Sequence, residues 1–113
     1  MEKILNYIAE SLLSIGPTAS VLEAMHVMDE NRIHSLLVEE SGDYIGIITN
    51  HDISKKVVSE HLTPEKVQVA DIMNFPLIKL ESQESMERAA QVMRDHDVHH
   101  LVVTEHGQML GTL

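Results

Sequence analysis

The stretch IHSLLVEESG (residues 33–42) decides the fold, because a close variant of it, VHHLVVTEHG (residues 98–107), returns 65 positions later. Sliding the chain along itself by 65 positions aligns residues 4–48 with 69–113 without a gap. The alignment contains 11 identities in 45 pairs, where chance at ordinary composition gives about 3. Glycines match as well as apolar residues do. The sequence therefore predicts two copies of one structural unit.

Each copy predicts a short strand, a helix, and then two strands joined by a glycine-containing turn. Ser20 and Ser85 stand where helix N-caps belong, ahead of apolar residues at helical spacing. The helices are predicted to end at 31–32 and 96–97, and the turns to lie at 41–43 and 106–108. The strands are predicted at residues 12–15, 33–38 and 44–48 of copy one and at residues 77–80, 98–103 and 109–113 of copy two.

The residues that follow the second hairpin strand are present for the first copy alone. Residues 52–58 predict a helix with Lys55 and Lys56 one turn in, and residues 59–68 form a polar linker to copy two. The counterparts of Thr49 and Asp52 in copy two would be positions 114 and 117, beyond Leu113. We therefore expect the second copy to lack its last helix, with apolar surface left on its hairpin for another subunit to cover.

Composition narrows the classes of protein that the chain can represent. The 113 residues carry a formal net charge of −10, which argues against a general nucleic-acid binder. The absence of Cys excludes disulfides and thiolate chemistry and fits a cytoplasmic location. No apolar run is long enough for membrane insertion. Because no nucleophile–base pair, P-loop or zincin spacing is present, we do not expect an enzyme.

The repeated unit carries a family resemblance. Its Gly-x-apolar-apolar ending, which in copy one runs GIITNHD (residues 46–52), and the VADIM opening of copy two (residues 69–73) resemble a tandem pair of cystathionine β-synthase (CBS) domains, also called a Bateman module. Leu37 stands where that family often has proline. The motif alone is weak, but its duplicated context makes the resemblance specific and extends it over nearly the whole chain.

The resemblance implies a fold and a kind of function. The fold class is α/β (α+β), with two tandem β-α-β-β-α units packed with pseudo-two-fold symmetry, repeat one being 1–62 and repeat two 66–113. The implied function is regulation: the cleft between the units binds AMP, ADP, ATP or S-adenosylmethionine, and a conformational signal passes to a fused or separate effector domain. No cofactor is required, and a homodimer is expected through packing of CBS units. The alternative is a ligand-free dimerisation or scaffolding module.

Thr49 and Asp52 match the positions at which the family binds ribose and phosphate. A carboxylate can accept hydrogen bonds from both hydroxyls of a ribose, and a threonine at a helix start can bond a phosphate. The alternative for both residues is structural, as caps of the helix that follows. Lys55 and Lys56 are candidates for a phosphate contact. Because the net charge of −10 disfavours a triphosphate, AMP and S-adenosylmethionine rank above ATP.

The resemblance also places an apolar slot for adenine at two matching segments. These candidate residues are Ile33, His34 and Ser35 in one copy and Val98, His99 and His100 in the other. The sequence leaves open which slot would serve Asp52, whether Ile33 and Val98 are simply core residues, and whether His34 and His99 contact a ligand or solvent. A metal site is not expected, since adjacent His99 and His100 on a predicted strand would point to opposite faces. At most one well-formed nucleotide site is expected per chain.

Overall fold

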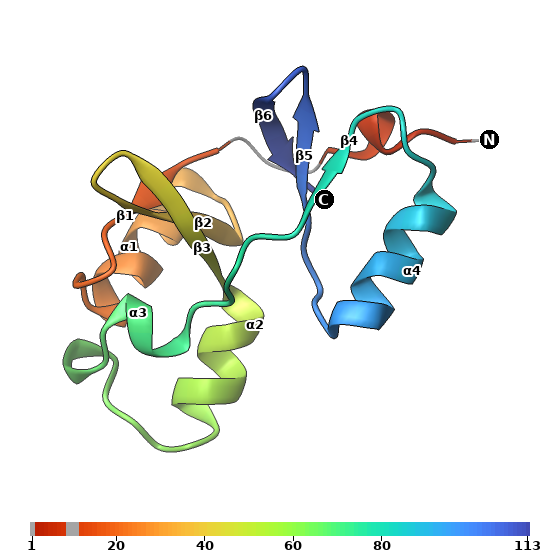
Figure 1. Ribbon diagram of the computed structural model, residues 1–113. Coiled ribbons are helices and arrows are strands. Elements are labelled where there is room, and N and C mark those ends of the chain that lie inside the picture. Colours follow the sequence, from red (N-terminus) through yellow and green to blue (C-terminus); the bar gives the residue numbers. More distant parts are fainter. Residues whose placement is uncertain (1, 9–11) are drawn as a thin grey trace. The chain divides into compact units, whose positions relative to one another are not determined.

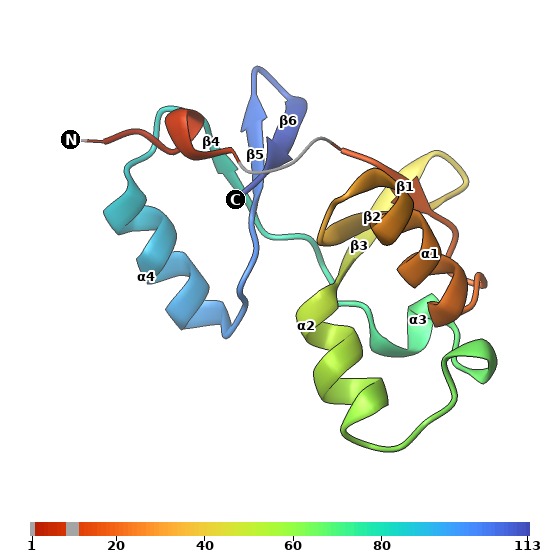
Figure 2. The same cartoon turned by 180° about the vertical axis from the view of Figure 1, so that it is seen from behind.

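The computed structural model describes residues 2–8 and 12–113, which form two compact units. Residues 13–76 make one unit, and Leu77–Leu113 make the other together with residues 2–8 and 12. Each unit contains a three-stranded mixed sheet, and Figures 1 and 2 show the elements of both units from opposite sides. The predicted α/β class with two similar units is confirmed.

The unit of residues 13–76 is built on the sheet β1-β2-β3, in which β1 runs parallel and β3 antiparallel to β2. Helix α1 follows β1, and α2 continues directly into the π-helical segment η2. The 3₁₀ turn η3 and helix α3 complete the unit. The bounds are β1 (Ser14–Ile15), α1 (Val21–Asn31), β2 (Ser35–Glu40), β3 (Asp43–Thr49), α2 (Asn50–Ile53), η2 (Ser54–Val58), η3 (Pro64–Lys66) and α3 (Val69–Ile72).

The second unit repeats this plan on the sheet β4-β5-β6, again with one parallel and one antiparallel pairing. Its first element comes from the start of the chain, because the 3₁₀ turn η1 lies beside β4 in Figures 1 and 2. The bounds are η1 (Ile4–Tyr7), β4 (Lys79–Glu81), α4 (Met86–His96), β5 (Val102–Glu105) and β6 (Gln108–Thr112).

The predicted helix caps and hairpin turns are confirmed. The Ser20 hydroxyl accepts from the Glu23 amide and the Ser85 hydroxyl from the Arg88 amide, at 3.1 Å each. Both hairpins turn through two residues with positive φ, the second being Gly42 (φ 85°) or Gly107 (φ 80°). Consecutive positive φ values match the twist of the flanking strands, so the same turn closes both hairpins.

Strands β2 and β5 begin later than predicted, at Ser35 and Val102 rather than at residues 33 and 98. The amides of Ile33 and Val98 donate to the carbonyls of Met28 and Met93, at 3.0 Å each, and so close the last turns of α1 and α4. Such a bond is half of the usual C-terminal helix cap. A residue whose amide is used in this way ends a helix and does not start a strand.

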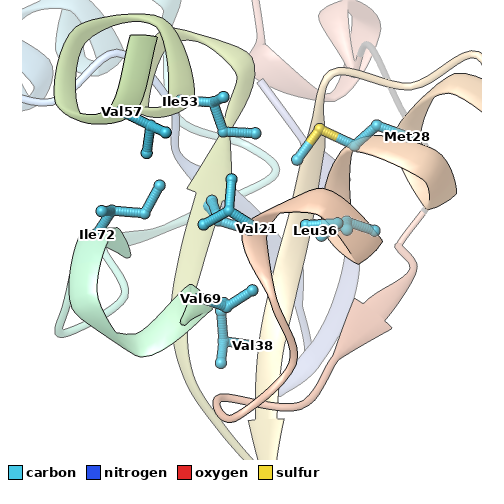
Figure 3. Packing of buried hydrophobic residues seen from close by; sticks show 10 residues of the cluster. Val21, Met28, Leu36, Val38, Ile53, Val57, Val69 and Ile72 are labelled. Atoms are coloured by element: carbon cyan, nitrogen blue, oxygen red, sulfur yellow. The ribbon is translucent and has the colours of Figure 1, made fainter. Parts of the chain in front are cut away.

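Each unit has its own apolar core. In the unit of residues 13–76, side chains from α1, β2, α2, η2 and α3 converge on one cluster, drawn in Figure 3. Its fully buried members include Val21, Val38, Val57 and Val69. In the other unit Ile4 is fully buried against α4 and β5, in a cluster with Ala89, Val92, Leu101 and Val103.

The first residues of each sequence repeat, which we call its opening, pack on the body of the other repeat. The opening of repeat two packs on the body of repeat one, because the Val69 amide donates to the Ala19 carbonyl at 2.9 Å. In the same way the Ile4 amide donates to the Glu84 carbonyl at 2.8 Å, so the start of the chain packs on the body of repeat two. Ile4 matches Val69 and Ala19 matches Glu84 at the 65-residue offset. The exchange is therefore reciprocal, and repeats and units divide the chain differently.

Candidate functional site

Thr49 and Asp52 form the start of α2. Thr49 ends β3 and is the N-cap residue, and its hydroxyl accepts from the Asp52 amide at 3.1 Å. The Asp52 carboxylate in turn accepts from the Thr49 amide at 3.0 Å and from the Thr49 hydroxyl at 2.8 Å. These reciprocal bonds make a capping box. The alternative that the sequence left open, a structural cap, is thus present at this site.

Two further residues reach the Asp52 carboxylate. The Asn74 side-chain amide donates to both of its oxygens, at 3.0 and 2.9 Å, and the Lys56 ammonium lies 3.2 Å from Oδ1. The Asp52 residue is only 4% exposed. Burying a carboxylate is costly unless it is paired and hydrogen-bonded, and this carboxylate is both. Asp52 forms, with Thr49, Lys56 and Asn74, what we call the Asp52 cluster.

Lys56 also holds the end of α3. Its ammonium donates to the Ile72 carbonyl at 2.8 Å and to the Asn74 side-chain oxygen at 3.4 Å, so that η2 is tied to the segment after α3. The two elements lie side by side in Figures 1 and 2. Lys55, the other candidate phosphate ligand, is exposed on the same segment. The structure therefore separates two residues that the sequence treats alike.

A cavity of about 570 Å³ lies on the other side of α2. Ile33 and His34, which belong to the predicted adenine slot, line it together with Asn50, Ile53 and Ser54. Residues 50, 53 and 54 share one face of a helix, whereas residues 52 and 56 share another. The remaining lining residues come from α1, its C-cap residue and the end of η2: Met25, His26, Met28, Asp29, Arg32 and Val58.

The lining of this cavity includes some of the candidate residues of copy one and not others. Ile33 and His34 line the cavity, whereas Thr49 and Asp52 belong to the Asp52 cluster and are not among the cavity's lining residues. The two places are joined through the backbone, since the Asn50 amide donates to the His34 carbonyl at 3.0 Å. Ser35 is 3% exposed at the start of β2, directly opposite Thr49 in the sheet.

The candidates of copy two lie in the other unit. Val98 packs against the core of that unit, and His99 and His100 lie between α4 and β5. The prediction that these two histidines sit on a strand is wrong, because β5 begins at Val102. The strand argument against a shared metal ion therefore does not apply to them. Among residues 2–8 and 12–113, no group of three or more His, Asp or Glu residues is placed to hold a metal ion.

Sequence reasoning missed Asn74. It lies 22 positions after Asp52, and no motif or periodicity links the two. One sequence feature close to Asn74 is Gly46, which is repeated as Gly111. In the structure, a Cβ added to Gly46 would lie 2.8 Å from the Asn74 carbonyl oxygen. A repeated glycine in a strand marks a close backbone approach, but it does not say which segment approaches.

Comparison with known proteins agrees with this architecture. The family model of the CBS domain matches the chain twice, over residues 4–59 and 69–113. An uncharacterised protein of Methanopyrus kandleri is 35% identical over 98 residues, which cover 85% of this chain and 50% of that protein. The chain thus spans half of that relative's length. No helix of the described residues has the length and apolar character needed to cross a membrane.

Solved structures show the same fold. An uncharacterised conserved protein of Pyrococcus horikoshii superposes with a TM-score of 0.83 at 28% identity, over 99% of this chain and 85% of that one. A signal-transduction protein with CBS domains from Burkholderia ambifaria gives 0.81 at 26% identity, over 97% and 83%. CBS pairs are generally regulatory, ligand-binding modules. With both repeats matched, the chain belongs to the CBS domain family and is a tandem pair of CBS units.

Proposed function

We propose that this chain is a ligand-sensing regulatory module that binds an adenosine-containing ligand at Thr49 and Asp52 and relays its presence to a partner or fused domain. The observation that supports the proposal most is the Asp52 carboxylate itself. It is buried, it follows the family's glycine signature, and the Asn74 side-chain nitrogen lies within hydrogen-bond distance of both of its oxygens. The two hydroxyls of a ribose can donate to the two oxygens of a carboxylate.

The charges of the site bear on which adenosine derivative binds. Lys56 already contacts the Asp52 carboxylate and the Ile72 carbonyl, which leaves the exposed Lys55 as the other lysine candidate for a phosphate contact. The net charge of −10 opposes accumulation of further negative charge. AMP and S-adenosylmethionine are therefore ranked above ATP. Competition titrations with the three ligands test this order, and tightest binding of ATP would reverse it.

The first prediction concerns Asp52→Asn, which keeps the shape and one acceptor oxygen but removes the charge. We expect binding of AMP, measured by isothermal titration calorimetry, to weaken at least about tenfold, since charge-assisted hydrogen bonds are about twice as strong as neutral ones. Asp71→Asn is the matched control, because Asp71 fills the same capping-box position of α3. Equal losses in both variants, or none in Asp52→Asn, would argue against a ligand site at Asp52.

A specific observation favours a second candidate, a ligand-free assembly module. The Asp52 carboxylate already has internal donors from Thr49, Asn74 and Lys56. A CBS-CP12 protein from bloom-forming cyanobacteria, 23% identical, has the same fold with a TM-score of 0.87 and is hexameric. This candidate predicts a stable oligomer by light scattering and no rise in melting temperature with AMP, ATP or S-adenosylmethionine.

A further inference from the structure

The Asn74 side chain occupies the acceptor that the proposed ligand needs. Its amide nitrogen lies 3.0 Å from one oxygen of the Asp52 carboxylate and 2.9 Å from the other. One nitrogen thus reaches both oxygens, with an N–H shared between them. A vicinal diol would present two O–H donors to the same pair of oxygens, so the carboxamide and the diol are chemical competitors.

We infer that Asn74 is an internal competitor that sets the affinity of the Asp52 site. A ligand must displace the Asn74 carboxamide before its diol can reach the carboxylate. The inference rests on the proposed function and adds to it a residue that lowers the affinity for a diol ligand.

The position of Asn74 connects the displacement of its side chain with the end of the unit of residues 13–76. Its backbone is held on β3 by two hydrogen bonds with Ile47, at 3.0 and 2.8 Å, and Lys56 holds the preceding Ile72 carbonyl. The unit ends two residues later at Pro76, where the chain passes to the other unit. Displacing the Asn74 side chain removes one of the ties on this segment. Ligand binding and the contact between the Asn74 side chain and Asp52 affect each other reciprocally. A ligand that breaks this contact therefore binds better when the contact is weakened.

The test is calorimetric titration of AMP into wild type, Asn74→Ala and Asn31→Ala. Asn31 is the matched control, since its amide donates to the Val27 carbonyl at 2.8 Å in the same unit but away from Asp52. If the carboxamide holds the carboxylate for about 90% of the time, its removal lowers the Kd for AMP about tenfold. Asn31→Ala leaves the Kd unchanged.

The outcomes separate this inference from the proposed function. Wild-type binding of AMP with equal or weaker binding by Asn74→Ala overturns the inference and leaves the proposed function standing. No binding of AMP or S-adenosylmethionine by any of the three proteins overturns both. If circular dichroism shows that Asn74→Ala does not fold, Asn74→Ser replaces it, because a serine hydroxyl has one donor and the same direction is expected.

A second readout follows the segment that carries Asn74. Hydrogen exchange of the Ile47 and Asn74 amides in the wild-type protein is compared with and without saturating AMP. The inference expects faster exchange with AMP, because the side-chain tie is lost. Slower or unchanged exchange with bound AMP overturns the link between the ligand and this segment.

Discussion

Gly46 is a residue at which two chain segments come close together. A Cβ at this position would lie 2.8 Å from the Asn74 carbonyl oxygen and 2.9 Å from the Met73 sulfur. The carbonyl belongs to a segment whose Asn74 is paired with Ile47 through the backbone, so it cannot move without breaking that pairing. Gly46 therefore keeps the Asn74 side chain within reach of Asp52.

Gly46→Ala is expected to lower the free energy of unfolding by about 1–3 kcal/mol, the usual cost of overpacking. The measurement is urea denaturation followed by circular dichroism. Gly16→Ala is the control, because a Cβ there meets nothing within 4 Å, and its effect should stay within about 0.5 kcal/mol. Equal stability of the two variants would mean that the segment of Asn74 adapts freely.

The continuous helix formed by α2 and η2 presents different chemistry on its two faces. One face carries Asn50, Ile53 and Ser54 toward the cavity, and the other carries Asp52 and Lys56 toward the end of α3. The π-helical turn is closed by the Ser59 amide, which donates to the Ser54 carbonyl five residues back at 2.9 Å. One element thus serves both places where sequence reasoning put ligand contacts.

Lys56→Met tests the tie between η2 and α3. The variant keeps much of the side-chain length but leaves the Ile72 carbonyl and the Asp52 carboxylate each without one donor. We expect a loss of about 1–3 kcal/mol in the free energy of unfolding, measured by urea denaturation. Lys55→Met, on the exposed neighbour, should change stability by less than about 0.5 kcal/mol. A larger loss in Lys55→Met than in Lys56→Met would refute this assignment.

Short-range patterns made much of each element predictable. The caps at Ser20 and Ser85 and the turns at Gly42 and Gly107 depend on residues a few positions apart, so the sequence alone predicts them. The starts of β2 and β5 depend on bonds that close the preceding helices, which an apolar run does not reveal. The partnership of Asn74 with Asp52 requires tertiary contact across 22 positions, and local reasoning could not find it.

At the scale of the whole molecule, the reciprocal exchange of openings determines which residues stabilise which unit. Ile4 is fully buried in the core of the unit that contains residues 77–113, and Val69 is fully buried in the core of residues 13–76. The sequence repeats assign both residues to the opposite bodies. A repeat defined by sequence matching is therefore not a unit of stability.

Ile4→Ala is expected to lower the free energy of unfolding by about 2–5 kcal/mol, as large-to-small substitutions in cores do. The loss should fall on one unit, so that amide exchange speeds up in α4, β5 and β6 more than in α1, β2 and β3. Val69→Ala is the matched variant at the equivalent position and should show the reverse pattern. Mass spectrometry of exchanged peptides measures both. Faster exchange in β2 and β3 for Ile4→Ala would contradict the exchanged openings.

The exchanged opening also has a consequence for synthesis on the ribosome. Residues 13–76 are contiguous, so this unit can form as soon as it has left the exit tunnel. The segment of Ile4 emerges before this unit, yet the carbonyl of Glu84 that receives its amide is made 80 residues later. Closing so long a loop is slow compared with local pairing. The segment of Ile4 therefore has no core to pack against until residues 77–113 have been made.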